Sequence, residues 1–276
     1  MPDPVSYTAV LPIGESTVAF VSGLLDAERR RRGTRPGRRA LGSFRHAVMV
    51  LRWFLDGTRV AQLAGDNQVS GSTAYRYLHE AIDVLAAVAP GVHGALLAAR
   101  AAGHTHVNLD GTLIRTDRSK AVGPTAGVDL WWSGKHHHHG ANVQVLTAPD
   151  GWPLWTSPVR PGREHDTTCA RAHHGLLDAL ADWTDEGHAV LADLGYEGEN
   201  TRLTCPIKNI RGATLTVEQR TINTLHSATR ALAERGNSLL KTTFKALRRV
   251  TLCPWRIGTI TAAALVLLHH EHNRTT

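Results

Sequence analysis

One aspartate inside an apolar run limits what this chain can fold into more than any other feature. Residues 106–116 read HVNLDGTLIRT, and Val107, Leu109 and Leu113 give the pattern of a β-strand with Asp110 in its middle. A carboxylate in such a strand is costly to bury unless it meets a partner or a metal ion. Gly111 directly after it predicts a turn or a bulge. Asp110 therefore needs a partner from elsewhere in the chain.

A second acidic residue stands at the end of another predicted strand. The short apolar run 189–192 ends in Asp193, and Gly195 frees the backbone just after it. A side chain at the end of a buried strand, followed by glycines, lies at the edge of the sheet where a ligand can reach it. The sequence thus predicts two aspartates that meet at a common ligand.

A third acidic residue lies on a predicted helix. Arg230 and Glu234 are four residues apart, and Lys241 follows two turns later on the same face. Taken alone, Glu234 with Arg230 would be a surface ion pair worth under about 1 kcal/mol, and an aspartate before glycine is commonly a turn residue. Taken together, three carboxylates from a strand, a strand end and a helix are what a two-metal phosphoryl-transfer site requires, because Mg²⁺ prefers oxygen ligands.

Five motifs occur together in this chain. They are Asp110-Gly-Thr, residues 132–144 (WSGKHHHHGANVQ), residues 161–166 (PGREHD), residues 191–198 (LADLGYEG) and the spacing Arg230-x3-Glu234-x6-Lys241. This set resembles the DDE transposases of bacterial insertion sequences, specifically the insertion-sequence-five group, from about residue 40 to the end. Two positions depart from the family pattern: Ser227 stands where tyrosine is frequent, and Leu194 where a basic residue is frequent.

The resemblance implies a function and a site. It implies an RNase H-like catalytic domain in which Asp110, Asp193 and Glu234 hold two Mg²⁺ or Mn²⁺ ions. Such an enzyme cuts double-stranded DNA at the element's ends and joins the freed strand to target DNA, as a homodimer or a higher multimer. Arg230 and Lys241 would contact the flanking phosphates. Two alternatives remain, a DNA-binding protein derived from a transposase that lacks catalysis and a plain RNase H-like nuclease.

The charge of the chain agrees with a polyanionic partner. The 276 residues carry a formal charge of +7, with a pI near 9.8, and the cations are clustered. Seven arginines crowd one N-terminal segment, at positions 29, 30, 31, 32, 35, 38 and 39. This segment is either an arm that lies along DNA or a solvated basic linker.

Between the basic segment and the Asp110 strand, the pattern predicts a helix-turn-helix. Residues 41–55 form an amphipathic helix, a short helix capped by Thr58 follows, and a longer helix opens at Ser70. The second helix would present its first turn to a major groove. Its candidate DNA-binding side chains are Ser72, Thr73 and Arg76. A plain helical bundle is the alternative, and one of Tyr75 and Tyr77 must belong to the core.

The C-terminal part predicts a sheet flanked by helices. Two strands within residues 143–159, turned at Asp150-Gly151, form a hairpin that pairs with the Asp110 strand. A helix over 167–183 follows, and Asp166 either caps it or lies beside the metal ions. The long helix spans 221–247. Lys135 and the run His136–His139 form a basic loop that approaches DNA, or the histidines bind a metal ion.

These patterns predict an α/β fold class, an RNase H-like mixed sheet flanked by helices and preceded by a small all-α helix-turn-helix domain. The predicted divisions are an N-terminal segment with the basic arm (1–40), the helix-turn-helix domain (41–92) and the catalytic domain (103–276). Three widely spaced cysteines indicate neither a disulfide framework nor a zinc motif. The longest apolar run, 257–268, is too short to span a bilayer, so no membrane association is expected. We expect a cytoplasmic protein of the bacterial nucleoid.

Overall fold

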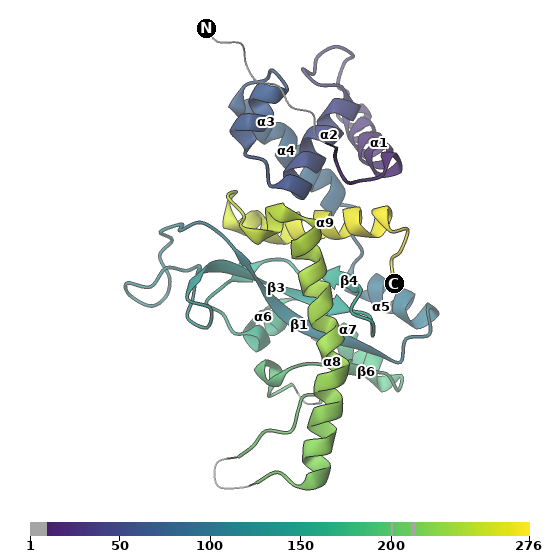
Figure 1. Ribbon diagram of the computed structural model, residues 1–276, viewed down its shortest axis with the longest axis vertical. Helices are drawn as coiled ribbons and strands as arrows, with labels where there is room; N and C mark the ends of the chain where they lie inside the picture. The colour runs from purple at the N-terminus through teal and green to yellow at the C-terminus, as the bar shows by residue number, and fades with distance from the viewer. Residues whose placement is uncertain (1–9, 200, 211–213) are drawn as a thin grey trace.

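A mixed β-sheet lies at the centre of the molecule, with a group of helices at one end and the long helix α8 across one face (Figure 1). The structure is a computed structural model that describes residues 10–199, 201–210 and 214–276. In chain order its elements are α1 (Glu15–Arg31), α2 (Ser43–Asp56), α3 (Val60–Asp66), α4 (Gly71–Ala86), α5 (Val92–Ala101), β1 (His106–Arg115), β2 (Trp132–Ser133), β3 (His138–Thr147), β4 (Pro153–Thr156), β5 (Arg160–Pro161), α6 (Asp166–Ala172), α7 (Leu176–Asp185), β6 (Ala189–Leu191), η1 (Leu194–Tyr196), α8 (Val217–Thr243), η2 (Lys245–Arg248), η3 (Pro254–Arg256) and α9 (Ile257–Glu271).

The strand order in the sheet is β2-β3-β1-β6, and β4 and β5 also pair with β3. The predicted hairpin of β3 and β4 is confirmed, and β3 pairs antiparallel with β1, as predicted. That pairing runs without interruption through Gly111, which lies opposite Gln144. The turn or bulge predicted at Gly111 is therefore wrong. On its other side β1 pairs with the parallel strand β6.

The two faces of β1 meet different helices, because successive side chains of a strand point to opposite faces. Asp110 and Thr112 contact α8, where Asn237 and Lys241 bond to them. Gly111, on the opposite face, contacts α6. The sheet is thus enclosed between α8 on one side and α6 on the other.

The helices that flank the sheet differ from the predicted ones in their bounds. The single helix predicted over 167–183 is two helices, α6 and α7, separated at Gly175, whose φ of +77° is unfavourable for other residues. The long helix α8 begins earlier than predicted, at Val217, because Thr216 and Gln219 form a capping box before it. It also ends earlier, at Thr243.

The N-terminal helices pack on one another through buried apolar faces. In α4, Tyr77 is buried at 3% exposure while Tyr75 is 47% exposed, so the prediction that one of the two belongs to the core is confirmed. Ser70 caps α4, accepting the N–H of Thr73, as its position predicts. The predicted cap at Thr58 is wrong, since α3 begins later, after Arg59.

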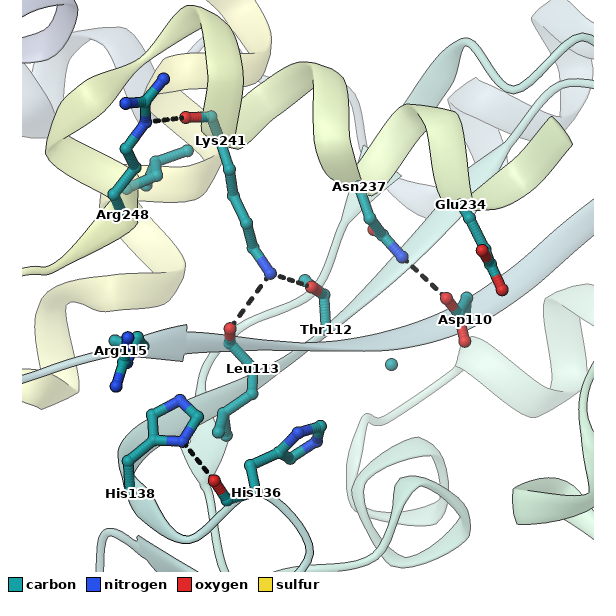
Figure 2. Close-up of a pocket in the computed structure, with 12 residues that line it drawn as sticks. Asp110, Thr112, Leu113, Arg115, His136, His138, Glu234, Asn237, Lys241 and Arg248 are labelled. Atoms are coloured by element: carbon teal, nitrogen blue, oxygen red, sulfur yellow. Dashed lines mark hydrogen bonds between the residues drawn. The ribbon is translucent and has the colours of Figure 1, made fainter. Parts of the chain in front are cut away.

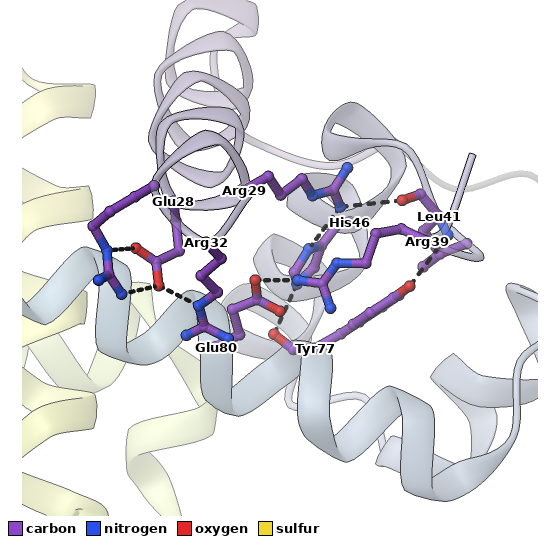
Figure 3. Close-up of polar contacts among 9 residues, drawn as sticks. Glu28, Arg29, Arg32, Arg39, Leu41, His46, Tyr77 and Glu80 are labelled. Carbon is purple, nitrogen blue, oxygen red and sulfur yellow. Dashed lines mark hydrogen bonds and ion pairs between the residues drawn. The ribbon is translucent and has the colours of Figure 1, made fainter. Parts of the chain in front are cut away.

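Several arginines of the basic segment form contacts within the folded protein. Figure 3 shows Arg29 donating to the carbonyl of Leu41 at 3.1 Å and Arg39 paired with the buried carboxylate of Glu80. Arg32, just after α1, pairs with Glu28 of that helix at 2.5 Å. The pair of Arg39 with Glu80 holds the segment after α1 against α4 instead of leaving it extended.

The C-terminal helix α9 joins the helical end of the molecule to the sheet. It packs against α4 on one side and β4 on the other, and almost its whole apolar sequence is buried (Figure 1). None of the helices that the structure describes is both long and apolar enough to cross a membrane. The cysteines Cys169, Cys205 and Cys253 are unbonded thiols.

Candidate active site

The carboxylate of Asp110 is held on the α8 face of β1 by two side chains of α8. Asn237 Nδ2 donates to one carboxylate oxygen at 2.8 Å, and Arg230 Nη2 lies 3.4 Å from the other. Only 18% of the Asp110 side chain is exposed. The prediction that this buried acid has a partner from a distant segment is confirmed, and the partners are a neutral amide and a guanidinium.

The parallel pairing of β6 with β1 brings Asp193 to the level of Asp110. Asn108 lies opposite Leu191 in this pairing, and each aspartate follows two residues later. Asp193 comes just after the end of β6, where its Oδ1 accepts the N–H of Gly195 at 2.8 Å and so caps η1. The two aspartates therefore reach the same edge of the sheet from neighbouring strands.

Glu234 reaches the site from α8. Four residues of this helix share the face toward β1 because they are spaced three or four apart: Arg230, Glu234, Asn237 and Lys241. Figure 2 shows Glu234 beside Asp110. Both residues line a cavity of about 530 Å³. Asp110 and Glu234, which are far apart in the sequence, thus lie beside one cavity, and the charge of Asp193 reaches Asp110 from the neighbouring strand.

The pKa of Asp110 reflects its burial and the charges around it. Burial raises the pKa of Asp110 to about 6, the Arg230 guanidinium opposes this rise, and the carboxylates of Asp193, Asp166 and Glu234 add to it. An ionised carboxylate is disfavoured both by low dielectric surroundings and by like charges nearby.

The donor chemistry of this cluster fits a hard divalent cation, which prefers carboxylate oxygens. The side chains are not arranged as a complete coordination sphere, however. Within residues 10–199, 201–210 and 214–276, no three His, Cys, Asp or Glu side chains stand close enough together to hold an ion. The oxygens of Asp110 also bond to Asn237 and Arg230, and Asp193 accepts the Gly195 N–H. A cation would have to exchange with these donors.

Asp166 is a fourth acid at the site, and its position explains Gly111. A Cβ on Gly111 would overlap the Asp166 carboxylate, and Asp166 Oδ2 lies 3.4 Å from where a Cβ on Gly195 would stand. The predicted cap role of Asp166 is wrong, since α6 begins after His165 without a side-chain cap. Its alternative, a place beside the metal ions, stays a prediction, and the carboxylate of Asp166 raises the pKa of Asp110.

A chain of buried hydrogen bonds fixes Asp166 from behind. Tyr196 donates to the Gln144 side chain, whose Nε2 donates to Asn142 Oδ1 at 2.8 Å. Asn142 Nδ2 in turn donates to Asp166 Oδ1 at 2.6 Å. Burial raises the pKa of the Tyr196 hydroxyl well above 10, so that hydroxyl remains a donor at any working pH. The Asp166 carboxylate is thus oriented by three neutral side chains.

The predicted DNA-binding residues lie in two regions. Arg230 is paired with Asp110, and Lys241 Nζ bonds to Thr112 Oγ1 at 2.6 Å, where burial lowers the pKa of the lysine. Lys135 is 66% exposed and lies 3.5 Å from Asp166. The other three are on α4, away from this site: Ser72, Thr73 and Arg76. Whether any of them contacts DNA stays a prediction.

Sequence reasoning missed Asn237, which makes the shortest hydrogen bond to Asp110. Its spacing carried the signal, since it follows Glu234 by three residues and Arg230 by seven and so must share their helix face. Because only the charged residues of this helix face were considered, the neutral hydrogen-bond donor between them was overlooked.

We expect the Asp110→Asn variant to be more stable than the wild type at pH 7 in EDTA, by about 1–3 kcal/mol. The folded protein holds the Asp110 proton up to about pH 6, whereas the ordinary pKa of an aspartate is 3.8. Wild-type stability therefore falls as pH rises from about 4 to about 6. Asparagine has no charge to bury, so urea unfolding at pH 4 and pH 7 should show the difference only at the higher pH. A variant less stable at pH 7 would contradict the burial argument.

Comparison with known proteins gives one match that covers most of the site. Residues 109–269, more than half of the chain, match the model of the DDE superfamily endonuclease family. That match includes Asp110, Asp193 and Glu234. No curated protein sequence matches the chain.

Solved structures give only weak similarity. The chain is 12% identical to the Mos1 transposase in a paired-end complex with the left transposon end, covering 98% of this chain and 82% of that one with a TM-score of 0.21. For a pre-cleavage Mos1 transpososome the identity is 12%, the coverage 99% and 82%, and the TM-score 0.20. Scores this low do not establish a shared arrangement, and the family match stands without them. By that match, the chain belongs to the DDE superfamily endonuclease family.

Proposed function

We propose that this protein is a DNA transposase of the insertion-sequence-five group, with an RNase H-like catalytic domain. It cleaves DNA at the ends of its element and transfers the freed strand into target DNA. The observation that carries the proposal is that Asp110 and Glu234 line one cavity, and that Asp193 lies near enough to raise the pKa of Asp110. All three acids lie inside the part of the chain that matches an endonuclease family. The antiparallel strands β4, β3 and β1, followed by the parallel β6, support the fold assignment.

Asp110, Asp193 and Glu234 would hold two Mg²⁺ or Mn²⁺ ions. Bound there, such ions would lower the pKa of the attacking water or hydroxyl group and would offset the charge on the leaving oxygen. The protein's own part is positioning. Asn237 directs the Asp110 carboxylate toward α8, the Gly195 N–H fixes Asp193, and the rigid α8 carries Glu234.

The helices α3 and α4 would bind double-stranded DNA as a helix-turn-helix. The first turn of α4 supports this, since Ser72 and Arg76 are exposed there and Thr73 is bonded to Arg76 at 3.1 Å. Lys135 would contact DNA near the catalytic centre. The proposed working form is a homodimer or higher multimer on DNA in the bacterial cytoplasm, because two element ends are cut together.

We expect Arg76→Ala to weaken binding about tenfold on DNA that the wild-type protein selects from a random pool. A lost contact to a base edge costs about 1–3 kcal/mol. Arg45→Ala, at an exposed position on α2, is the matched control and should bind like the wild type. Fluorescence anisotropy measures both. Equal affinity of the Arg76 variant and the control would remove α4 from the DNA interface.

A DNA-binding protein without catalysis is the second candidate. It is favoured by the way Arg230 and Asn237 occupy the Asp110 oxygens, since a cation must displace them before it can bind. A plain RNase H-like nuclease is a further alternative.

One assay separates the three functions. The wild-type protein is incubated with Mg²⁺ or Mn²⁺ and a supercoiled plasmid that carries candidate element ends. Nicked and joined products support the transposase, and nicks without joined products indicate a nuclease. An unchanged plasmid, together with retained DNA binding, rejects the catalytic proposal in favour of the DNA-binding protein.

A further inference from the structure

The cavity beside Asp110 has ends of opposite charge. Asp110 and Glu234 form the acidic end, and the cations Arg115 and Arg248 line the other, with Lys241 between them (Figure 2). Asp110 and Arg115 are both on β1, five residues apart, which corresponds to roughly 16 Å of strand. The cavity is therefore long enough for more than one backbone phosphate, since one strand of duplex DNA carries a phosphate about every 3.4 Å of axis.

The side chains of Arg248 and Lys241 bond to neutral oxygens beside the cavity. Arg248 bonds to neutral oxygens, with Nε donating to the Lys241 carbonyl at 3.0 Å, and Lys241 Nζ donates to Thr112 Oγ1 and to the Leu113 carbonyl. Within the described part of the chain, neither Arg115 nor Arg248 forms an ion pair with a carboxylate. The next residue, Arg249, differs, because it pairs with Asp117 at 2.6 Å outside the cavity lining.

The spacing between these cations is fixed by the backbone. The Val250 N–H donates to the Arg115 carbonyl at 2.8 Å, and Thr116 Oγ1 donates to the Val250 carbonyl at 3.0 Å. The chain that carries Arg248 is therefore tied to the end of β1. A binding site whose parts are already in place loses little entropy when a ligand binds.

The histidine loop closes the cavity opposite α8. His136 and His138 both line it, and His138 Nδ1 donates to the His136 carbonyl at 2.6 Å (Figure 2). The loop that carries the histidines thus forms one wall of the cavity. A ligand in the cavity meets cations from β1, α8 and η2 together.

We propose that Arg115 and Arg248, with Lys241, form a subsite for the backbone phosphates of the DNA strand that is cut. The strand follows β1 from the acidic end, where the phosphate under attack lies, toward Arg115. Arginine suits this role because its planar guanidinium binds phosphate oxygens in pairs. The inference rests on the proposed function, which identifies the ligand as DNA. Beyond that function, it states on which side of Asp110 the cut strand lies.

The test measures DNA binding without cleavage. Affinity for a short fluorescein-labelled DNA duplex is measured by anisotropy in EDTA over a series of NaCl concentrations. Each phosphate contact contributes about 0.9 to the slope of log affinity against log salt. We expect Arg115→Gln and Arg248→Gln each to reduce the slope by about 1, and the double variant by about 2. Arg249→Gln, the matched control outside the cavity, keeps the wild-type slope.

Two further comparisons keep the inference falsifiable. Arg248→Lys retains the positive charge, so its slope should be close to that of the wild type. If its slope is as low as that of Arg248→Gln, Arg248 acts only by holding α8 in place through its hydrogen bonds. That result would overturn the inference. The inference is also overturned if the double variant has the same slope as Arg249→Gln. The binding measurement is made in EDTA, where no DNA is cut, so its result does not depend on catalysis. Failure of the plasmid assay would therefore reject the transposase proposal and leave the measured salt slopes valid.

Discussion

The Asp110→Asn variant should cut DNA at least about a thousandfold more slowly than the wild type while it binds DNA with nearly unchanged affinity. Asparagine has the shape of aspartate and can still bond to Asn237, so the fold and the face of β1 toward α8 stay intact. It lacks the negative charge that a cation requires. Metal ions contribute several kcal/mol to such reactions, and about 4 kcal/mol corresponds to roughly a thousandfold in rate.

The measurement compares nicking of supercoiled plasmid with anisotropy on the same DNA. Asp178→Asn, which removes an exposed carboxylate from α7 far from the cavity, is the matched control and should cut like the wild type. Equal loss of cutting and binding in the Asp110 variant would indicate a folding defect or a different active site. Unchanged cutting would reject Asp110 as a catalytic residue.

Local periodicity was enough to predict much of the fold. The Asp110 strand, the hairpin that pairs with it and the apolar helix α9 each follow from side-chain alternation or from an apolar stripe. The shared helix face of Arg230 and Glu234 follows from the helical repeat alone. These features depend on neighbours in the sequence, so one sequence determines them.

The errors lie where distant residues decide the local structure. Asp110-Gly111 has the local pattern of a turn, but the pairing partner β3 keeps the strand straight through it. The helix predicted after Asp166 breaks at Gly175, where the chain needs a left-handed conformation. The role of Asp166 could not be read locally either, because its partner Asn142 lies on another element.

The second large effect concerns Gly111 itself. We expect Gly111→Ala to lower the free energy of unfolding by about 1–3 kcal/mol and to impair cleavage strongly. The added Cβ would stand 2.6 Å from Asp166 Cγ and 3.1 Å from Gln144 Nε2. Asp166 must move, which leaves the amide of Asn142 buried without its acceptor, at a cost of about 1–3 kcal/mol. The gain from replacing a strand glycine, about 0.5–1 kcal/mol, is smaller.

A double-mutant cycle with Asp166→Ala separates this cause from a general backbone effect. If the Cβ acts by displacing the carboxylate, Gly111→Ala costs less in the Asp166→Ala background, because the space is then free. Urea unfolding should show a coupling of about 1 kcal/mol or more. Gly134→Ala, where no atom lies within 4 Å of the new Cβ, is the matched control and should be neutral. If the effects of the two substitutions on the free energy of unfolding simply add, Gly111 is needed for the geometry of the strand and not to make room for Asp166. The close packing of Asp166 against β1 would then have no part in organising the acids of the candidate site.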